Sequence, residues 1–456
     1  MNTLIYTSIL GLLCMVVEIL DLRKILVPMI ILGLATIFYF NLEDWNHVQF
    51  FYNNMIRVDN FSVAFSGLAI VLSVLIFVLS ADFYKEDSRH ISDYLAILIF
   101  ALCGAIVMFS FWNMAMLFLG IEILSISLYI MAGSKRFDVK SNEAGFKYFL
   151  MGSFASGFLL FGIALIYGAT GSFHLANIAT YVSLGHISPM FYVGMMIMLV
   201  AMLFKVAAVP FHFWSPDVYE GAPALVTAYM STLVKIAAFG AFYRLFYVTF
   251  ISTFDSINLI LAIVTAATII LGNVTALSQL NFKRLLAYSG ISHAGYLMLG
   301  LISMKGGTAN AMFFYSAGYA IATIGAFAVA ILVFKAMKNE NIEAFNGLGK
   351  KNPMLAAALT LSMLSLAGIP PFVGFLGKYY IFSEAIRNGQ ITLTFIALLN
   401  SIVGVYYYFK VILAMYTKEA NETEVSGTVS YYVIISICLL LSIALGLFPD
   451  MLMHLF

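Results

Sequence analysis

The chain has 456 residues, of which 62% are hydrophobic and only 10% are charged. A soluble domain of this length carries about 25% charged residues, so the composition excludes a water-soluble globular protein and indicates a chain that crosses a membrane many times. The formal net charge of +1 gives no sign of a nucleic-acid partner, and we expect none.

About fourteen apolar segments follow one another along the chain, each close to the roughly 20 residues that a helix needs to cross the hydrocarbon core. The segments 25–40 and 94–110 look short. The segment 353–386 is long and contains Gly368 and two prolines, which indicates a broken helix. We therefore predict an all-α polytopic membrane protein. The predicted spans are 3–20, 25–40, 60–81, 94–110, 113–132, 147–168, 189–213, 221–247, 256–277, 284–302, 309–335, 353–386, 391–416 and 430–454.

The first segment lacks a basic start and a small-residue cleavage site, so we interpret it as a retained span and not as a signal peptide. The three cysteines, Cys14, Cys103 and Cys438, stand singly in apolar segments without the spacing of an iron–sulfur or zinc site. We therefore expect no cofactor and no metal in this chain.

Lysine and arginine are distributed unevenly among the segments that connect the predicted spans. Of the 23 basic residues, 14 fall on one side of the membrane, four on the other and five inside spans, if there are fourteen spans. Because cytoplasmic loops are rich in lysine and arginine, the side with four is the outer one, and we expect both termini on the periplasmic side. The four outer basic residues are Arg57, Arg244, Lys305 and Arg387.

Two short sequences resemble each other, AAVPF at 207–211 and AGIPP at 367–371. They fall in the seventh and twelfth predicted spans, and this odd offset gives two units of opposite orientation. Inverted repeats with broken helices are typical of transporters, whose ion sites lie at the breaks. The alternative is a pair of unrelated proline kinks.

Three ionisable residues stand out inside the predicted spans, because a charge at the bilayer centre costs about 2.5–3.5 kcal/mol on insertion scales. Glu122 lies in the middle of its span, Lys205 lies beside the break at Pro210, and Lys235 lies in the middle of the next span. Burial disfavours the charged form of each group and a nearby opposite charge favours it, so these residues are candidates for proton transfer. The alternatives are a carboxyl held neutral by a hydrogen bond and a lysine that extends to the membrane surface.

Three more candidates follow from the same argument. Lys378 lies after the break in the twelfth span, and His293 lies in a span that also carries Tyr296 and two serines. Imidazole titrates near neutrality and relays protons, although a hydrogen-bonded structural histidine is the alternative. Lys147 lies close to the start of its span, where extension to the membrane surface is an equal alternative.

The segments FKVAAVPFHFWSPDVYEGAP, FKRLLAYSGISHAGY and LAGIPPFVGFLGKYYIF resemble subunit N of bacterial NADH–quinone oxidoreductase, respiratory complex I. The resemblance covers nearly the whole chain. The sequence WSPDVYEGAP and the lysine at 378 are similar to subunit N and differ from subunit M, and the chain is too short for subunit L. The resemblance therefore places the chain among the antiporter-like membrane subunits.

This family resemblance implies fourteen helices and two inverted five-helix repeats with broken helices in spans 7 and 12. On this chain the two units are 94–250 and 251–417, between an N-terminal three-helix segment, 1–93, and a C-terminal helix, 418–456. It also implies that Glu122 pairs with Lys205. The residues that it implies for proton transfer are Glu122, Lys205, Lys235, Lys378, Lys147 and His293.

The resemblance implies a proton-translocating subunit of an NADH:quinone oxidoreductase in the bacterial inner membrane. NADH, FMN, iron–sulfur clusters and quinone would then be bound by partner subunits, and the neighbours would be subunit M and small subunits such as K. Three alternatives stay open: a subunit of a multisubunit cation/proton antiporter, a purely structural membrane-arm subunit, and a membrane hydrogenase subunit.

Overall fold

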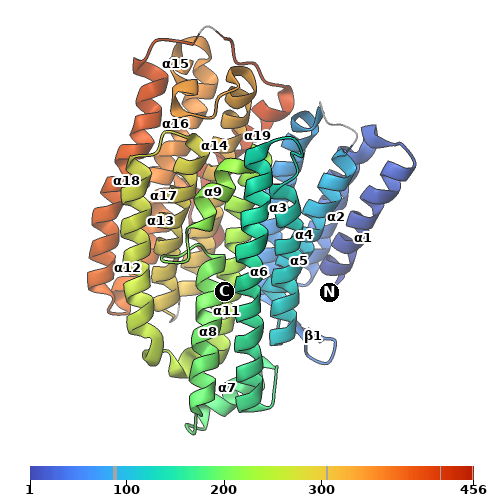
Figure 1. Ribbon diagram of the computed structural model, residues 1–456, viewed down its shortest axis with the longest axis vertical. Helices are drawn as coiled ribbons and strands as arrows, with labels where there is room; N and C mark the ends of the chain where they lie inside the picture. The colour runs from blue at the N-terminus through green and yellow to red at the C-terminus, as the bar shows by residue number, and fades with distance from the viewer. Residues whose placement is uncertain (86–89, 305–306, 422, 454) are drawn as a thin grey trace.

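The computed structural model describes residues 1–85, 90–304, 307–421, 423–453 and 455–456. Within these ranges twelve helices are long and apolar enough to cross a membrane, which confirms the all-helical, multi-spanning fold (Figure 1). Two further regions, at the predicted seventh and twelfth spans, consist of shorter helices separated by a break. Counting each of these regions as one span gives fourteen, and that number stays a prediction.

Most of the long helices are uninterrupted. They are α1 (Asn2–Ile19), α2 (Arg23–Glu43), α3 (Asn60–Phe83), α4 (Ile91–Ser110), α5 (Met114–Ala132), α6 (Val139–Thr170), α12 (Asp255–Leu277), α13 (Phe282–Ile302), α14 (Thr308–Met337), α18 (Ile391–Thr417) and α19 (Val429–Leu447). The remaining one, Ala224–Thr253, joins α10 (Ala224–Tyr229), the π-helical turn η2 (Met230–Val234), α11 (Lys235–Leu245), a second π-helical turn η3 (Phe246–Phe250) and the 3-10 turn η4 (Ile251–Thr253).

The other elements are short and lie between the long helices. They are α7 (Leu175–Ser183), η5 (Ile342–Phe345), α15 (Leu348–Lys351), α20 (Asp450–Met453) and an antiparallel hairpin of β1 (Gln49–Phe51) and β2 (Ile56–Val58). The hairpin pairs Phe50 with Arg57 and leads directly into α3.

Two helices that we expected to be short have ordinary lengths, so that expectation was wrong. α2 has 21 residues and α4 has 20. The first turn of each contains polar residues that an apolar segment leaves out, Arg23 and Lys24 in α2 and Ser92 and Asp93 in α4. A helix extends as far as its backbone hydrogen bonds do, and its first turn accommodates polar side chains easily.

Both predicted breaks are present. In the first, α8 (Pro189–Lys205) ends at Lys205 and α9 (Trp214–Gly221) begins after a turn; in the second, α16 (Pro353–Ala367) is followed by Gly368 at φ +84° and then by α17 (Val373–Arg387). Each break contains a cis X-Pro peptide bond, before Pro210 and before Pro371. Proline cannot continue a helix, so carbonyl groups at each helix end lack an intrahelical partner inside the bundle.

The two broken helices also begin alike. Pro189 and Pro353 each occupy the first helical turn, where a missing N–H costs nothing. The side chains of Ser188 and Asn352, directly before them, accept hydrogen bonds from backbone N–H groups of the first turn. The sequence therefore defines the start of each broken helix as clearly as its end.

The domain boundaries near residues 93, 250 and 417 stay predictions.

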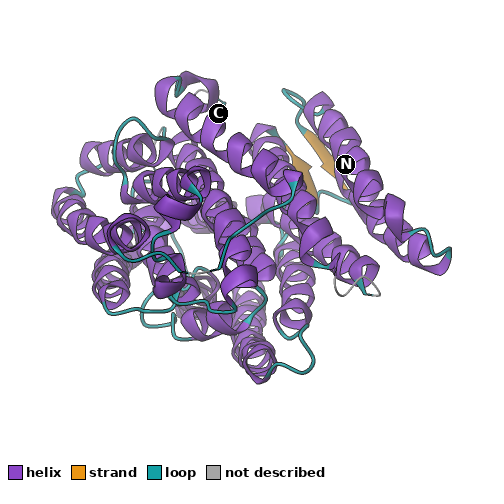
Figure 2. Cartoon of the chain, turned by 90° about the horizontal axis from the view of Figure 1, so that it is seen from above, coloured by secondary structure: helices purple, strands orange, loops and turns teal. Residues whose placement is uncertain are grey.

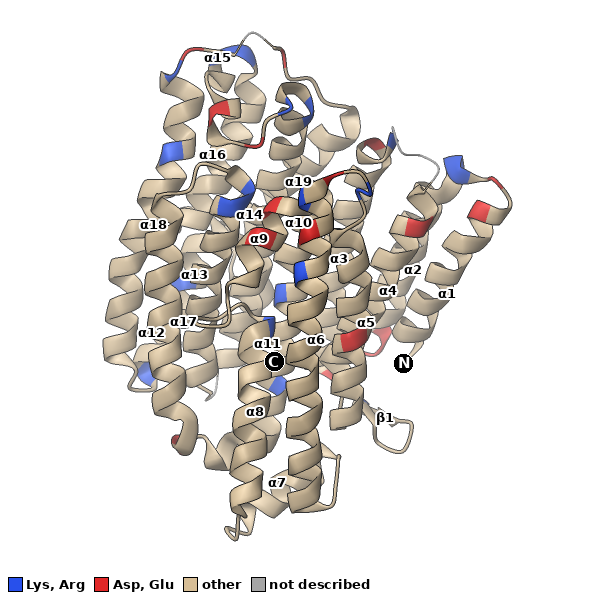
Figure 3. Ribbon diagram, viewed as in Figure 1, with Lys and Arg blue, Asp and Glu red and all other residues tan. Residues whose placement is uncertain are grey.

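Three helices form the centre of the bundle. In their most apolar stretches the composite helix Ala224–Thr253 and α14 are buried at every position, and α13 is buried at 94% of positions. In the pair α1 and α2 at one edge and in α12 and α18 at the other, fewer than two fifths of the positions are buried and the exposed side chains are largely apolar, as suits helices that face lipid (Figures 1 and 2). Charged residues gather towards one end of the bundle (Figure 3). A charged residue on a central helix is therefore held away from lipid and water alike.

Candidate functional site

Lys205 is the last residue of α8, at the edge of the first break. Its ammonium donates a hydrogen bond of 2.9 Å to the hydroxyl of Ser125 and one of 3.5 Å to that of Tyr129, both on α5. The sequence predicted this lysine well inside a span. In the structure it is the last residue of the helix, because the helix is capped at Val206 and the chain then turns. Its partners in this structure are neutral hydroxyl groups.

Glu122 lies one helical turn before Ser125 on α5. Its carboxylate accepts a short hydrogen bond from the hydroxyl of Ser156 on α6. Among the described residues no ion pair joins Glu122 to Lys205, so the predicted direct pair is not formed in this structure. The two groups still interact electrostatically, and Ser125 separates them.

A small cavity connects Lys205 to Lys235. Its volume is about 10 Å³, close to the space that one water molecule needs. Both lysines line it, together with Trp214 and Tyr219 of α9 and Met230 of the π-helical turn. The break after α8 thus places a small cavity between two lysines that are 30 residues apart in the sequence.

Lys235 follows the π-helical turn η2 directly and is only 5% exposed. Its ammonium donates a short hydrogen bond to the main-chain carbonyl of Gly290 on α13, and it lies 5.4 Å from the centre of the Tyr319 ring. A Cβ atom on residue 290 would lie 2.8 Å from the ammonium, so glycine is the residue that leaves room for it. Lys235 is therefore held by a carbonyl and an aromatic ring.

His293 lies one turn after Gly290 on the same helix and is 3% exposed. Its Nδ1 atom is hydrogen-bonded to the hydroxyl of Tyr315 at 2.5 Å, and its Nε2 atom to that of Tyr408 at 3.0 Å. The ring also packs against Tyr319, with 4.8 Å between centres. Lys235 and Lys378 both act on it electrostatically, so both ammonium groups lie near the imidazole.

Lys378 lies in the second half of the other broken helix and is 6% exposed. Its ammonium donates to the carbonyl of Ala367 at 2.7 Å, where α16 ends, and to the hydroxyl of Ser401 at 3.0 Å. It also lies 5.3 Å from the centre of the Tyr296 ring, which in turn lies 5.8 Å from the ring of His293. The second break thus supplies the carbonyl that holds this lysine.

These contacts join four of the predicted residues in one continuous series, which runs from Lys205 through Lys235 and His293 to Lys378. Glu122 acts on Lys205 electrostatically and stands before the start of the series. Hydroxyl groups, aromatic rings, one carbonyl and one small cavity form the links. Such a series of titratable groups in a low-dielectric interior can store and pass on protons, and it contains no arrangement for covalent chemistry.

Lys147 does not belong to this series, and of the two equal interpretations the structure agrees with extension to the surface. Its side chain is 38% exposed and forms ion pairs of 2.7 Å with Glu143 and with Asp217. Arg284 also pairs with Asp217, at 2.7 Å. The long side chain reaches the charged end of the bundle from the first half of α6, as the alternative interpretation stated.

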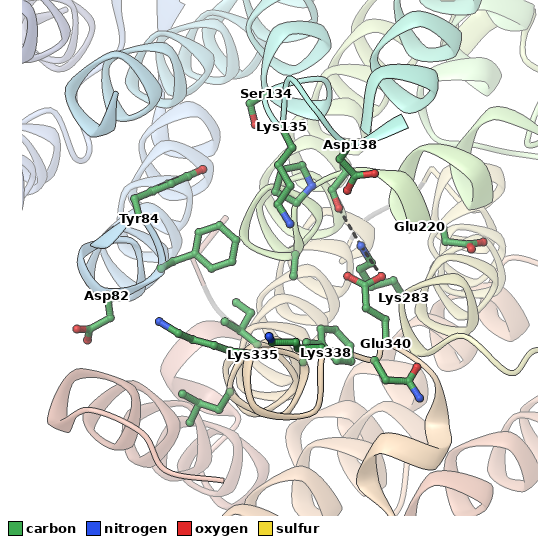
Figure 4. A pocket seen from close by; sticks show the side chains of 18 of the residues that line it. Asp82, Tyr84, Ser134, Lys135, Asp138, Glu220, Lys283, Lys335, Lys338 and Glu340 are labelled. Carbon is green, nitrogen blue, oxygen red and sulfur yellow. Dashed lines mark hydrogen bonds and ion pairs between the residues drawn. The ribbon is translucent and has the colours of Figure 1, made fainter. Parts of the chain in front are cut away.

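A large pocket opens at the same charged end, with a volume of about 1020 Å³. Its described lining includes six lysines and four carboxylates, and Figure 4 shows Lys135, from the loop after α5, with Lys283 of α13 and Lys335 of α14 around one space. Lys283 is 2% exposed and donates to the carbonyl of Ala222 at 2.9 Å while pairing with Glu340 at 2.9 Å. Lys283 lies just outside the predicted span 284–302, so it was not among the candidates.

The short helix α9 separates this pocket from the cavity between the lysines. Gly221, its last residue, lines the large pocket, whereas Trp214 and Tyr219, further back, line the small cavity. Only part of this eight-residue helix therefore lies between the charged end of the bundle and the series of buried lysines.

Known proteins resemble the chain over its full length. A model of the NADH:quinone oxidoreductase/Mrp antiporter transmembrane family matches residues 112–404. NADH-quinone oxidoreductase subunit N of Flavobacterium psychrophilum is 50% identical over 455 residues, which cover 100% of both chains. The chain belongs to the NADH-quinone oxidoreductase subunit N family. The family resemblance expected from the three sequence motifs is thus confirmed.

Solved structures place the subunit N family chain in the same fold. A chain of respiratory complex I from Thermus thermophilus with bound aureothin is 32% identical, with a TM-score of 0.82 and coverage of 99% of this chain and 98% of that one. A chain of the Mrp complex from Dietzia sp. DQ12-45-1b has a TM-score of 0.89 at 21% identity, covering 99% of this chain and 95% of that one. The second similarity shows the fold alone.

In this subunit N family member, the groups that connect the lysines were not predicted from the sequence. Tyr315 and Tyr319 stand four residues apart on α14, and Tyr408 is on α18. Each is a buried tyrosine whose hydroxyl needs a hydrogen-bond partner, and a tyrosine within an apolar segment was the sequence feature that could have indicated it. Their contacts with His293 depend on helices that pack together from distant parts of the sequence.

Proposed function

We propose that this chain translocates protons through its series of buried residues, as a membrane subunit of NADH-quinone oxidoreductase. NADH oxidation and quinone reduction take place in other subunits, and their conformational or electrostatic signal reaches this chain through the membrane arm. The observation that supports the proposal most directly is the continuity of the contacts from Lys205 to Lys378, across both broken helices.

The first step is a change in the separation of Lys205 and Glu122. A nearby carboxylate favours the ammonium form of a lysine, and separation of the two favours the neutral amine. When Lys205 moves towards Glu122 it holds its proton. When it returns to the hydroxyl of Ser125, the attraction of the carboxylate weakens and the proton can leave.

The next steps carry the proton along the series. Water in the cavity takes it from Lys205 to Lys235, and it then passes the ring of Tyr319 to His293. The hydroxyls of Tyr315 and Tyr408 hold the two imidazole nitrogens, so one can donate while the other accepts. From His293 the proton reaches Lys378 and leaves on the outer side.

The proposal extends to the surroundings of the chain. Both termini lie on the periplasmic side of the bacterial inner membrane. NADH, FMN, iron–sulfur clusters and quinone are bound by partner subunits, and subunit M and small subunits such as K are the neighbours in the membrane arm. Relatives named as subunits of this enzyme support the assembly in general terms.

Substitution of Lys235 tests the proposal in the assembled complex. We expect K235M to leave NADH oxidation measurable in inverted membrane vesicles and to lower the number of protons taken up per NADH. K410M is the matched control, because Lys410 donates to the carbonyl of Gln279 near the end of α18, away from the series. Proton uptake in K235M equal to that of the wild type would refute the pathway.

The same vesicles separate the proposal from its alternatives. Pumping that requires sodium would favour the cation/proton antiporter. Normal assembly together with lost pumping in K235M would exclude a purely structural subunit, because a scaffold does not need this ammonium.

A further inference from the structure

A second pocket lies at the opposite end of α3 from the lysine-rich one. Its volume is about 600 Å³. Asp59, Asn60 and Phe61, at the start of α3, line it, whereas Asp82 and Phe83, at the end of the helix, line the first pocket. Because α3 has 24 residues, the two pockets are about 36 Å apart along the helix axis.

Two arginines meet one aspartate in this pocket. The Nε atom of Arg57 lies 3.2 Å from one oxygen of Asp59, and a terminal nitrogen of Arg244 pairs with the other oxygen. Burial raises the pKa of the Asp59 carboxyl, but the two arginines and its hydrogen bonds lower the pKa by more, so the carboxylate stays ionised. The described lining side chains therefore carry two positive charges and one negative charge.

The arginines retain unused hydrogen-bond donors. Arg244 is 4% exposed, and its Nε–H has no hydrogen-bond partner among the described residues. A guanidinium has five N–H donors, and a buried donor without an acceptor is costly. The ring of Trp112 lies 4.4 Å from the centre of the Arg57 guanidinium and 6.0 Å from that of Arg244, which fixes their orientation. The pocket thus presents ordered, unsatisfied donors with excess positive charge.

The chain end does not neutralise this charge directly. Phe456 lines the pocket, and its main-chain oxygen accepts a hydrogen bond from Asn310 at 3.2 Å. No ion pair joins Phe456 to either arginine in the part of the chain that the structure describes. The Nε–H of Arg244 therefore keeps no acceptor among the described residues, and an additional anion would supply one.

The rest of the lining indicates where this anion comes from. Trp112, Tyr243 and Tyr247 are the residue types that gather at the level of lipid headgroups. Tyr247 is 46% exposed and Val48 is 57% exposed, so the pocket opens to the outside of the bundle beside apolar side chains. Arg57 and Arg244 are also two of only four basic residues that the sequence places on the outer side.

We propose that this pocket binds the phosphate group of a phospholipid. Arg57 and Arg244 hold the phosphate oxygens, because the planar guanidinium matches a phosphate with paired hydrogen bonds. The aromatic and aliphatic residues at the mouth contact the glycerol and the start of the acyl chains. A free phosphate ion would use the same donors but would leave this apolar surface exposed.

Lipid binding to the purified full-length chain tests the proposal. The chain is washed free of lipid in detergent and titrated with dioleoylphosphatidylglycerol, and bound lipid is counted by native mass spectrometry. We expect one site that saturates for this lipid and none for dioleoylglycerol, which has the same chains but no phosphate. R57Q should weaken binding about tenfold, the effect of losing roughly one charge-assisted hydrogen bond.

Two matched variants sharpen the result. D59N should bind more tightly than the wild type, because asparagine still caps α3 but no longer competes for the arginines. R387Q should bind like the wild type, because Arg387 is 74% exposed on the same side and pairs with Glu384. We use R57Q as the test variant and not R244Q, because Arg57 is 29% exposed and its substitution should not prevent folding.

The proposal is wrong if R57Q and D59N both bind the lipid like the wild type, or if dioleoylglycerol binds as well as phosphatidylglycerol. The lipid assignment is also wrong if inorganic phosphate displaces phosphatidylglycerol at equal concentration, since the site would then prefer the free ion.

Discussion

The ammonium of Lys235 and the main-chain carbonyl of Gly290 form a hydrogen bond between two of the most deeply buried helices of the bundle. No carboxylate takes part in this contact. A proton on Lys235 is therefore stabilised by dipoles and an aromatic face, which hold an ammonium less firmly than an ion pair does. This arrangement suits a group that must release its proton again.

Replacing Gly290 by alanine should disturb this contact directly. The added Cβ would lie 2.8 Å from the ammonium and 3.2 Å from the hydroxyl of Tyr319, so Lys235 must move. We expect proton pumping in vesicles to fall about tenfold, equivalent to about 1.4 kcal/mol in the barrier. Overpacking should also lower the stability of the subunit, by about 1–3 kcal/mol. G157A is the control, because a Cβ there meets nothing within 4 Å.

Loss of one tyrosine hydroxyl should interrupt the series at His293. Y408F removes the group that is hydrogen-bonded to both the imidazole Nε2 atom and Ser289. We expect slower pumping with normal assembly, because an unpaired buried group costs about 1–3 kcal/mol while the ring still fills its space. Y406F tests the specificity, since Tyr406 is 66% exposed. Equal pumping rates in the two variants would remove Tyr408 from the pathway.

Removing the hydroxyl of Ser125 should strengthen the interaction between Lys205 and Glu122. In S125A the ammonium loses its acceptor at 2.9 Å, and the carboxylate one turn away becomes the favoured partner. We expect slower proton release from Lys205 and a lower pumping rate at unchanged expression. S127A is the comparison, because the Ser127 hydroxyl donates only to the carbonyl of Ile123 on its own helix. Pumping at the wild-type rate in S125A would contradict this role.

Lys147 should be much less sensitive than the buried lysines. Its ion pairs with Glu143 and Asp217 are partly exposed, and such pairs contribute about 0–1 kcal/mol. We expect K147A to keep pumping within about twofold of the wild type, which corresponds to less than 0.5 kcal/mol. K235A, measured in the same vesicles, gives the contrast. A K147A variant as impaired as K235A would show that the exposed network takes part in proton transfer.

The sequence predicted the buried charges well because an ionisable residue in an apolar helix is rare and visible. Lys205, Lys235, His293 and Lys378 were all found in this way, and the two proline breaks were found from their prolines and Gly368. The all-helical fold class followed from the same apolar segments, whereas the count of fourteen spans stays a prediction.

The connections between these residues could not be predicted in the same way. Gly290 contacts Lys235 across 55 residues, and Tyr408 contacts His293 across 115, so both depend on how distant helices pack. The exposure of Lys147 and the burial of Lys283 depend on where each helix ends relative to the charged end of the bundle. Local hydrophobicity does not contain that information.

Lys235 and Lys378 both donate to a main-chain carbonyl, and mutation affects such a partner differently from a side chain. The carbonyls of Gly290 and Ala367 belong to the main chain, so no point mutation can delete them. Substitutions at position 367 keep the acceptor as long as α16 still ends there, whereas position 290 is restricted by the lack of space for a Cβ atom. The binding partners of these two lysines are thus inherited through the shape of the backbone, and the subunit can diverge in sequence around them without losing either one.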